Sequence, residues 1–131
     1  MEEAKPAEQS PILPESQLIS IEDFGKVKLV TAHVVGAANH PKADRLLVLQ
    51  VKVGEKTKQI VAGVRQYYSA VPPEGDGLPC IVGKTIIIVD NLQPTKLRGE
   101  DSNGMLLAVR TPLGLRLLTT DGPVDSGLAV G

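Results

Sequence analysis

Aromatic residues are scarce in this sequence of 131 residues: Phe24, Tyr67 and Tyr68 are the only ones, and tryptophan is absent. The core must therefore come from valine, isoleucine and leucine, which favours strands over helices. Few rings also count against a protein that stacks many bases of a single strand, because each stacked base needs its own ring. Recognition of a folded RNA by its shape and its phosphates is less affected by this shortage.

Cysteine and long apolar runs are lacking as well. Cys80 stands alone, which excludes an intrachain disulfide and a multi-thiolate metal site. His33 and His40 lie seven residues apart without further residues at metal-ligand spacing, so we expect no metal and no cofactor. No apolar stretch reaches membrane-spanning length, and the N-terminus lacks the basic start and apolar core of a signal peptide. These absences predict a cytoplasmic protein with no membrane partner.

Catalytic motifs are missing too. The sequence has no GxxxxGK[ST] phosphate loop, its histidines are isolated, and its acidic residues are scattered rather than paired for acid–base chemistry. We therefore expect a chain that is not itself an enzyme.

Charge is divided unevenly along the chain. Residues 1–23 carry six acidic side chains against one lysine, a net charge of −5, whereas residues 24–131 carry 13 basic and 9 acidic side chains, a net charge of +4. Mild basicity predicts weak, salt-sensitive binding of nucleic acid. Residues 1–16 are rich in Glu and Pro without an apolar period, so we expect a flexible linker there and one folded domain over residues 17–131.

Alternating and apolar segments predict a series of strands. A short turn capped by Ser20 precedes them, Gly36 marks a bulge or bend, and Gly54 begins a hairpin turn. Residues 65–83 are expected to be irregular, with one helical turn near their start. The expected strands span residues 26–37, 45–53, 57–64, 84–90, 105–110 and 115–119. This order fits an all-β fold, a five-stranded Greek-key OB barrel with an additional C-terminal strand and tail. The alternative is a β-sandwich, which at this length would normally need one or two more strands.

The connector between the strands at 84–90 and 105–110 is the most informative segment. It carries Asn91, Lys96 and Arg98, and then Ser102 leads into Met105. Two cations, an amide and a hydroxyl are donors suited to phosphate and sugar oxygens, here on a connector braced by two strands. In an extended segment Lys96 and Arg98 would face the same way. An ordinary solvated hairpin connection is the alternative.

Four ordered blocks, at residues 23–29, 40–46, 60–63 and 91–108, carry a family resemblance. Together they resemble the tRNA-binding domain found at the C-terminus of many bacterial methionyl-tRNA synthetases. The same module occurs in stand-alone dimeric tRNA-binding proteins and in CsaA-type export chaperones. The resemblance runs from about residue 20 to residue 131. The proline-rich stretch 70–80 departs from it, because relatives usually have a compact helical turn there, and Asn103 replaces a common glutamine or glutamate.

The resemblance implies an OB barrel that binds tRNA without catalysis and forms a homodimer through its C-terminal region. It also implies a covalently attached synthetase body, although a stand-alone protein remains the alternative. Lys96 and Arg98 are the expected phosphate contacts, and Ser102 and Met105 match family positions linked to RNA recognition. Met105 has a core position as its alternative, and Asn91 is either a contact or only a turn former.

A second expected contact region is the loop 40–46. We expect Lys42 and Arg45 to be weaker RNA contacts, and Lys26 and Lys28 to extend the basic face along the first strand. Asp44 is expected to be structural. The tyrosines at 67 and 68 either stack on a loop base or pack over one end of the barrel, the latter being favoured. Two other functions stay open from the sequence: a CsaA-like chaperone that binds extended polypeptide, and a pure dimerisation module.

Overall fold

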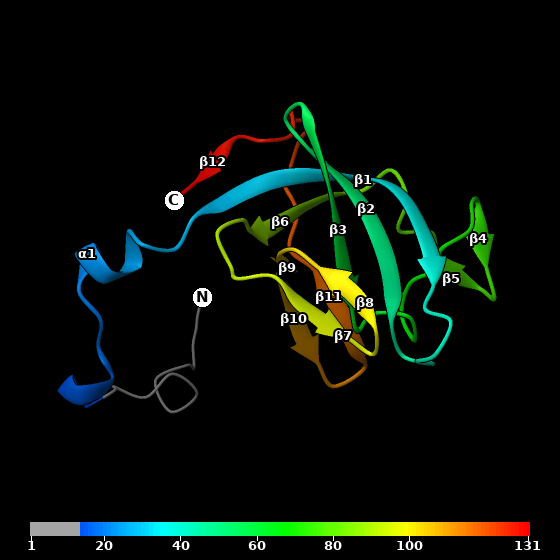
Figure 1. Cartoon of the computed structure of the whole chain (residues 1–131), viewed down its shortest axis with the longest axis horizontal. Coiled ribbons are helices and arrows are strands. Elements are labelled where there is room, and N and C mark those ends of the chain that lie inside the picture. Colours follow the sequence, from blue (N-terminus) through cyan, green and yellow to red (C-terminus); the bar gives the residue numbers. More distant parts are fainter. Residues whose placement is uncertain (1–13) are drawn as a thin grey trace, which may run out of the picture.

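The computed structural model describes residues 14–131, so most of the expected linker at 1–16 lies outside the described residues. Antiparallel strands form one curled sheet in the order β3-β2-β1-β6-β9, with β12 also paired to β1 (Figure 1). These strands are β1 (Leu29–Asn39), β2 (Leu47–Val53), β3 (Lys56–Ala62), β6 (Thr85–Val89), β9 (Met105–Leu106) and β12 (Ala129–Val130). The sheet curls until the segment before β9 reaches β3, where the Asn103 amide donates to the Gln59 carbonyl at 2.8 Å. This is the partly closed barrel of an OB fold, as predicted.

Valine, isoleucine and leucine fill the barrel, as the shortage of aromatics predicts. On β2 the buried side chains alternate, so that Leu47, Leu49 and Val51 are completely inaccessible to solvent. On β6 the whole run from Ile86 to Val89 is buried. Each such side chain contributes roughly 1.5–3 kcal/mol of hydrophobic free energy when fully buried.

The long strand β1 connects the two ends of the barrel. Its first half pairs with β6, from Leu29 to His33, and its second half pairs with β2, from His33 to Asn39. The register with β2 shifts between Val34 and Gly36, which confirms the predicted bulge. At roughly 3.3 Å per residue, β1 holds the segment before Leu29 and the loop after Asn39 apart by a contour of about 33 Å.

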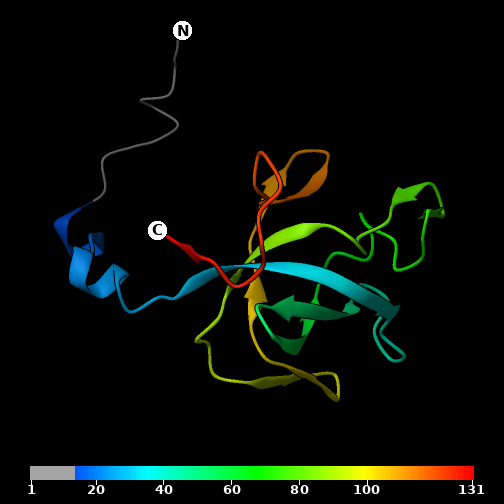
Figure 2. The same ribbon diagram turned by 90° about the horizontal axis from the view of Figure 1, so that it is seen from above.

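One expected strand differs from the structure. The single strand expected at 105–110 is split into β9 and β10 (Ala108–Thr111). The split falls at Leu107, whose backbone bonds two different segments of the chain. Its amide donates to the Ile87 carbonyl and its own carbonyl accepts from Leu118. Beyond this point β10 forms a separate hairpin with β11 (Gly114–Leu117), on the flank of the barrel (Figure 2).

The irregular stretch after β3 is partly as predicted. The Tyr68 amide donates to the Val64 carbonyl at 2.9 Å, which is the expected single helical turn. The proline-rich loop after this turn contains a small hairpin of β4 (Glu74–Gly75) and β5 (Leu78–Pro79), which the sequence did not predict.

Both ends of the described chain lie on the side of the barrel where β1 begins (Figure 1). The short elements η1 (Glu15–Gln17) and α1 (Ile21–Phe24) precede it, and the Ser20 hydroxyl accepts from the Asp23 amide at 3.0 Å, which confirms the predicted cap. The C-terminal segment runs along β1, where the Thr31 hydroxyl donates to the Asp125 carbonyl at 2.7 Å. Among residues 14–131, no helix is both long and apolar enough to cross a membrane.

Candidate nucleic-acid interface

The connector after β6 is not a plain loop but a two-stranded hairpin. Strands β7 (Thr95–Leu97) and β8 (Glu100–Ser102) pair around a two-residue turn, Arg98-Gly99. The φ angles of these two residues are +55° and +93°, a combination that matches a type I′ hairpin turn. Arg98 therefore lies in the left-handed region, at a cost of about 1–2 kcal/mol for a residue other than glycine. Because Arg98 is not extended, the expectation that it and Lys96 face the same way is not met.

The buried side chain of His40 joins this hairpin to the loop 40–46. Its Nε2 lies 2.9 Å from the Leu97 carbonyl, which can only accept, so Nε2 carries the proton. Its Nδ1 accepts from the Lys42 amide at 2.9 Å. His40 is only 3% exposed, and these two contacts define one neutral tautomer. The sequence analysis considered this histidine only as a metal ligand or a catalytic residue and expected neither, and it gave no sign of the positioning role.

Three cations from the two joined loops meet at one cavity. Lys42, Arg45 and Arg98 line a cavity of about 430 Å³, together with Asp44. All four side chains are exposed, and the Arg98 guanidinium leans on the Lys42 carbonyl through a long contact of 3.4 Å. Within residues 14–131, no ion pair involves any of the three cations. The structure thus brings together basic residues that belong to separate loops in the sequence.

Lys96, by contrast, is already paired. Its cross-strand neighbour is Asp101, and the Lys96 Nζ lies 2.6 Å from the Asp101 Oδ1. The hydrogen bond and the negative charge of Asp101 raise the pKa of Lys96 above its ordinary value. The side chain is therefore fully charged at neutral pH, but its charge is partly compensated by the carboxylate.

Comparison with known proteins identifies the family of this chain. The family model described as "Putative tRNA binding domain" matches residues 29–129. The chain belongs to this tRNA-binding domain family. It is 45% identical over 116 residues to a methionine–tRNA ligase of Halalkalibacterium halodurans, and 46% identical over 109 residues to one of Caldanaerobacter subterraneus subsp. tengcongensis. These matches cover 88% and 83% of this chain but only 16% of each ligase.

Solved structures agree on the fold. A MetRS-related protein from Pyrococcus horikoshii superposes with a TM-score of 0.74 at 29% identity, covering 88% of this chain and 99% of that one. A CsaA chaperone from Picrophilus torridus superposes with a TM-score of 0.73 at 22% identity, covering 87% of this chain and 100% of that one. The latter likeness concerns the fold alone.

Ser102 has a different role in this tRNA-binding domain from the one expected. Its side chain is 2% exposed, and its hydroxyl accepts from the Val61 amide at 2.9 Å. Its only proton points to the Gly104 carbonyl at 3.3 Å. The expected hydrogen bond to phosphate is therefore not available in this conformation, because the hydroxyl fastens β8 to β3. Met105 is 47% exposed, so the alternative of a core position does not apply to it.

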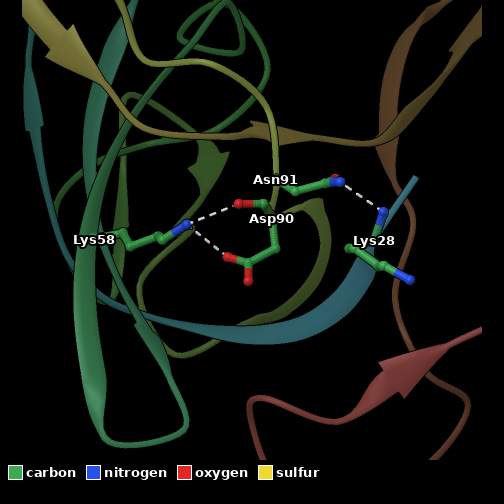
Figure 3. A network of polar contacts seen from close by, with 4 residues as sticks. All are labelled: Lys28, Lys58, Asp90 and Asn91. Atoms are coloured by element: carbon green, nitrogen blue, oxygen red, sulfur yellow. Dashed lines mark hydrogen bonds and ion pairs between the residues drawn. The ribbon is translucent and has the colours of Figure 1, made fainter. Parts of the chain in front are cut away.

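The side chain of Asn91 in the tRNA-binding domain forms hydrogen bonds with backbone groups just before β1 (Figure 3). Its Nδ2 donates to the Lys26 carbonyl at 2.6 Å, and its Oδ1 accepts from the Lys28 amide at 2.9 Å. Beside it, the Lys58 Nζ lies 2.6 Å from the Asp90 Oδ1 (Figure 3). Contacts with two distant segments, the residues before β1 and the strand β3, therefore hold the end of β6 in place. Asn91 thus lies in the turn after β6, and its side chain fastens this turn to the segment before β1.

Lys26 and Lys28 lie at the same end as Asn91. The Lys26 Nζ is 3.4 Å from the Asp23 Oδ1, and the Lys28 Nζ donates to the Gly25 carbonyl at 3.0 Å. The length of β1 separates both lysines from Lys42 and Arg45, which follow its other end. The expected continuous basic face along the first strand is therefore not what the structure shows.

Proposed function

We propose that this chain binds folded tRNA without catalysis, as an auxiliary domain of a methionyl-tRNA synthetase in the cytoplasm. The observation that carries the proposal is the cavity lined by Lys42, Arg45 and Arg98, where three cations from two loops converge. Membership of the tRNA-binding domain family and the ligases among its relatives support it. Because the chain spans 16% of these ligases, the attached catalytic body belongs to the proposal and not to the findings.

The chemistry of the cavity suits phosphate. An arginine guanidinium offers a planar fork of N–H donors to two phosphate oxygens, and lysine adds a point charge. Arg98 and Arg45 supply the forks in this proposal, and Lys42 supplies the point charge. Lys96 contributes less because Asp101 holds it. The exposed Met105 lies outside the lining of this cavity, and in this proposal it offers a separate, adaptable apolar contact.

The strength of binding depends on charge. With a net charge of +4 over residues 24–131, the domain should bind weakly and lose affinity steeply as salt rises. A weak tRNA-binding module is useful when it is tethered to an enzyme, because it raises the local concentration of tRNA at the catalytic body.

Arg98→Asn tests the contact without breaking the hairpin, since asparagine tolerates the left-handed conformation that Arg98 adopts. We expect tRNA affinity at low salt to fall, and the slope of log K against log salt to become shallower by about 0.7–0.9 for one lost phosphate contact. Anisotropy titrations with labelled tRNA over a salt series give both values. Lys56→Gln, at the exposed β2–β3 turn, is the matched control that should leave binding unchanged.

Two outcomes would replace the proposal. Unchanged tRNA binding by Arg98→Asn would remove the cavity from the interface. Binding of an unfolded polypeptide, with no binding of tRNA at low salt, would favour the chaperone function instead.

We also propose a homodimer formed through the C-terminal region. The strand β12 pairs with the first residues of β1 and so covers this part of β1 within the protomer. Leu128 and Val130 nevertheless stay 47% and 37% exposed. Phe24 and Val27, each 41% exposed, precede the same end of β1. A two-fold pairing there would double the number of cationic cavities available to one large RNA.

Light scattering tests the dimer. A double change of Leu128 and Val130 to serine should shift the mass at micromolar concentration from dimer to monomer. The control is Leu113→Ser, which removes an apolar side chain that is 91% exposed on the β10–β11 hairpin. A monomeric parent protein would contradict the proposal.

A further inference from the structure

Two neighbouring cavities on the flank of the barrel carry three basic residues, Lys84, Arg110 and Arg116, that the proposed function does not use. The first, of about 520 Å³, has Arg45 and Arg110 in its wall together with Tyr67. The second, of about 630 Å³, also has Tyr67 in its wall and adds Lys84 and Arg116. Because the two cavities share Tyr67, we treat them as one groove, named here the flank groove.

The flank groove continues from the cationic cavity of the proposed function. Arg45 lines both that cavity and the first part of the groove. The hairpins β7–β8 and β10–β11 lie on opposite sides of the barrel (Figure 2), and the loop that holds Arg45 lies between them at one end. A ligand that follows the cations would therefore pass around this end of the barrel.

The charge of the flank groove has one sign. The described residues that line it include Arg45, Arg110, Lys84 and Arg116, and no acidic side chain is among them. Within residues 14–131, none of these four cations takes part in an ion pair. A groove lined by one sign of charge concentrates the field and attracts a polyanion. Phosphates along a nucleic-acid strand fit this pattern.

Tyr67 supplies a ring in the middle of these charges. It is half-buried, and the Gly114 backbone lies so close that a Cβ there would come within 2.8 Å of the Tyr67 Cδ1 and Cε1 atoms. The ring is therefore held against the β10–β11 turn while it lines both parts of the groove. Its neighbour Tyr68 is buried, and its hydroxyl accepts from the Leu117 amide at 3.2 Å. The two tyrosines thus differ: Tyr68 packs in the core, and Tyr67 offers a surface for stacking one base.

We propose that the flank groove binds a single-stranded segment of the same tRNA whose folded part occupies the cavity at Arg98. Phosphates pair with Arg45, Arg110 and the cations beyond, and one base stacks on Tyr67. This inference rests on the proposed function and adds to it a second subsite with a different RNA structure as its ligand.

The test compares two probes: a labelled tRNA with its single-stranded 3′ end, and a blunt-ended RNA duplex of similar stem length, which has no unpaired nucleotides. Arg110→Gln should weaken tRNA binding about threefold or more, as for one lost phosphate contact, and Tyr67→Leu about fivefold or more, as for one lost stacked base. Both changes should leave binding of the blunt-ended duplex nearly unaltered. Tyr67→Phe keeps the ring and should bind tRNA like the parent, which separates stacking on the ring from a contact of the hydroxyl; unaltered binding of the duplex by Tyr67→Leu excludes damage to the fold.

The outcomes separate this inference from the proposed function. If Arg98→Asn weakens tRNA binding while Arg110→Gln and Tyr67→Leu do not, the flank groove is overturned and the proposed function stands. If Arg98→Asn changes nothing and the parent fails to bind tRNA, the proposed function itself is lost. Equal losses for Arg110→Gln and for the control Lys56→Gln would mean diffuse charge, and would also overturn the groove.

Discussion

Replacing Asp101 by asparagine should strengthen tRNA binding, because of the pairing across the β7–β8 hairpin. Asp101 holds the Lys96 ammonium at 2.6 Å, and both side chains are largely exposed, at 74% and 69%. Asparagine keeps the shape but removes the negative charge. The backbone role of residue 101 persists, because its carbonyl, not its side chain, accepts from the Gln59 amide group at 2.8 Å.

The size of the gain depends on the pair that is released. Exposed ion pairs are weak, so freeing Lys96 should raise affinity by a factor of about 1.5–5 at a given salt concentration. If the freed lysine then contacts a phosphate, the slope of log K against log salt steepens by about 0.7–0.9. Between 200 and 50 mM salt, the advantage of the variant over the parent should therefore grow about threefold.

Anisotropy titrations of the parent and of Asp101→Asn at four or more salt concentrations measure both quantities. Glu100→Gln is the matched control, because it removes one negative charge from the same hairpin but not the carboxylate that bonds Lys96. A second comparison places Asp101→Asn in a Lys96→Gln background, where the gain should vanish. An equal gain from Glu100→Gln, or a gain that persists without Lys96, would refute the reasoning and leave only net charge as the cause.

Three further predictions concern positioning and stability. His40→Ala should lower the free energy of unfolding by about 1–3 kcal/mol, since it leaves buried groups unpaired, and it should weaken tRNA binding although His40 is buried. Urea denaturation measures the stability and titration with tRNA measures the affinity. Full affinity for tRNA would contradict the positioning role. Ser102→Ala should cost about 1–3 kcal/mol of stability for the orphaned Val61 amide and leave the salt slope of tRNA binding unchanged, whereas lost affinity at full stability would restore the expected RNA contact. Removing residues 1–16 should leave the melting temperature and tRNA affinity nearly unchanged, because their sequence has no periodic apolar set, and a large drop in either would show that the folded domain begins earlier.

The sequence predicted the barrel well because its strands are set by local pattern. The run Ile86 to Val89 and the alternation of Leu47, Leu49 and Val51 identify strands without any tertiary knowledge. Gly36 marked its bulge for the same reason. Where strand pairing depends on distant partners, as at Leu107, which bonds both Ile87 and Leu118, the sequence showed only one continuous strand.

The candidate site was less predictable. An Arg-Gly turn lacks the usual Asn-Gly or Asp-Gly signature, so the β7–β8 hairpin went unrecognised. Without the hairpin, the register that places Asp101 opposite Lys96 could not be predicted either. The burial of Ser102 depends on how closely β8 approaches β3, which no local pattern records.

The flank groove could not be predicted from the sequence, for a different reason. Its wall residues, Arg45, Tyr67 and Arg110, come from three segments far apart in the chain. Only the curled sheet and the β10–β11 hairpin bring them to one surface, so no spacing between residues in the sequence predicts that they lie together.

Both ends of the described chain lie on the side of the barrel where β1 begins, and this has a mechanical consequence. The cationic loops lie at the other end, so a polypeptide joined ahead of residue 14 and an RNA held at Arg98 would grip opposite poles of the barrel (Figure 1). Tension between them runs along β1, parallel to the strand. The hydrogen bonds from β1 to β2, β6 and β12 would then be loaded side by side in shear instead of opening one after another like a zipper. If the proposed synthetase body and tRNA are attached at these two places, β1 is the strand that would carry force from one to the other.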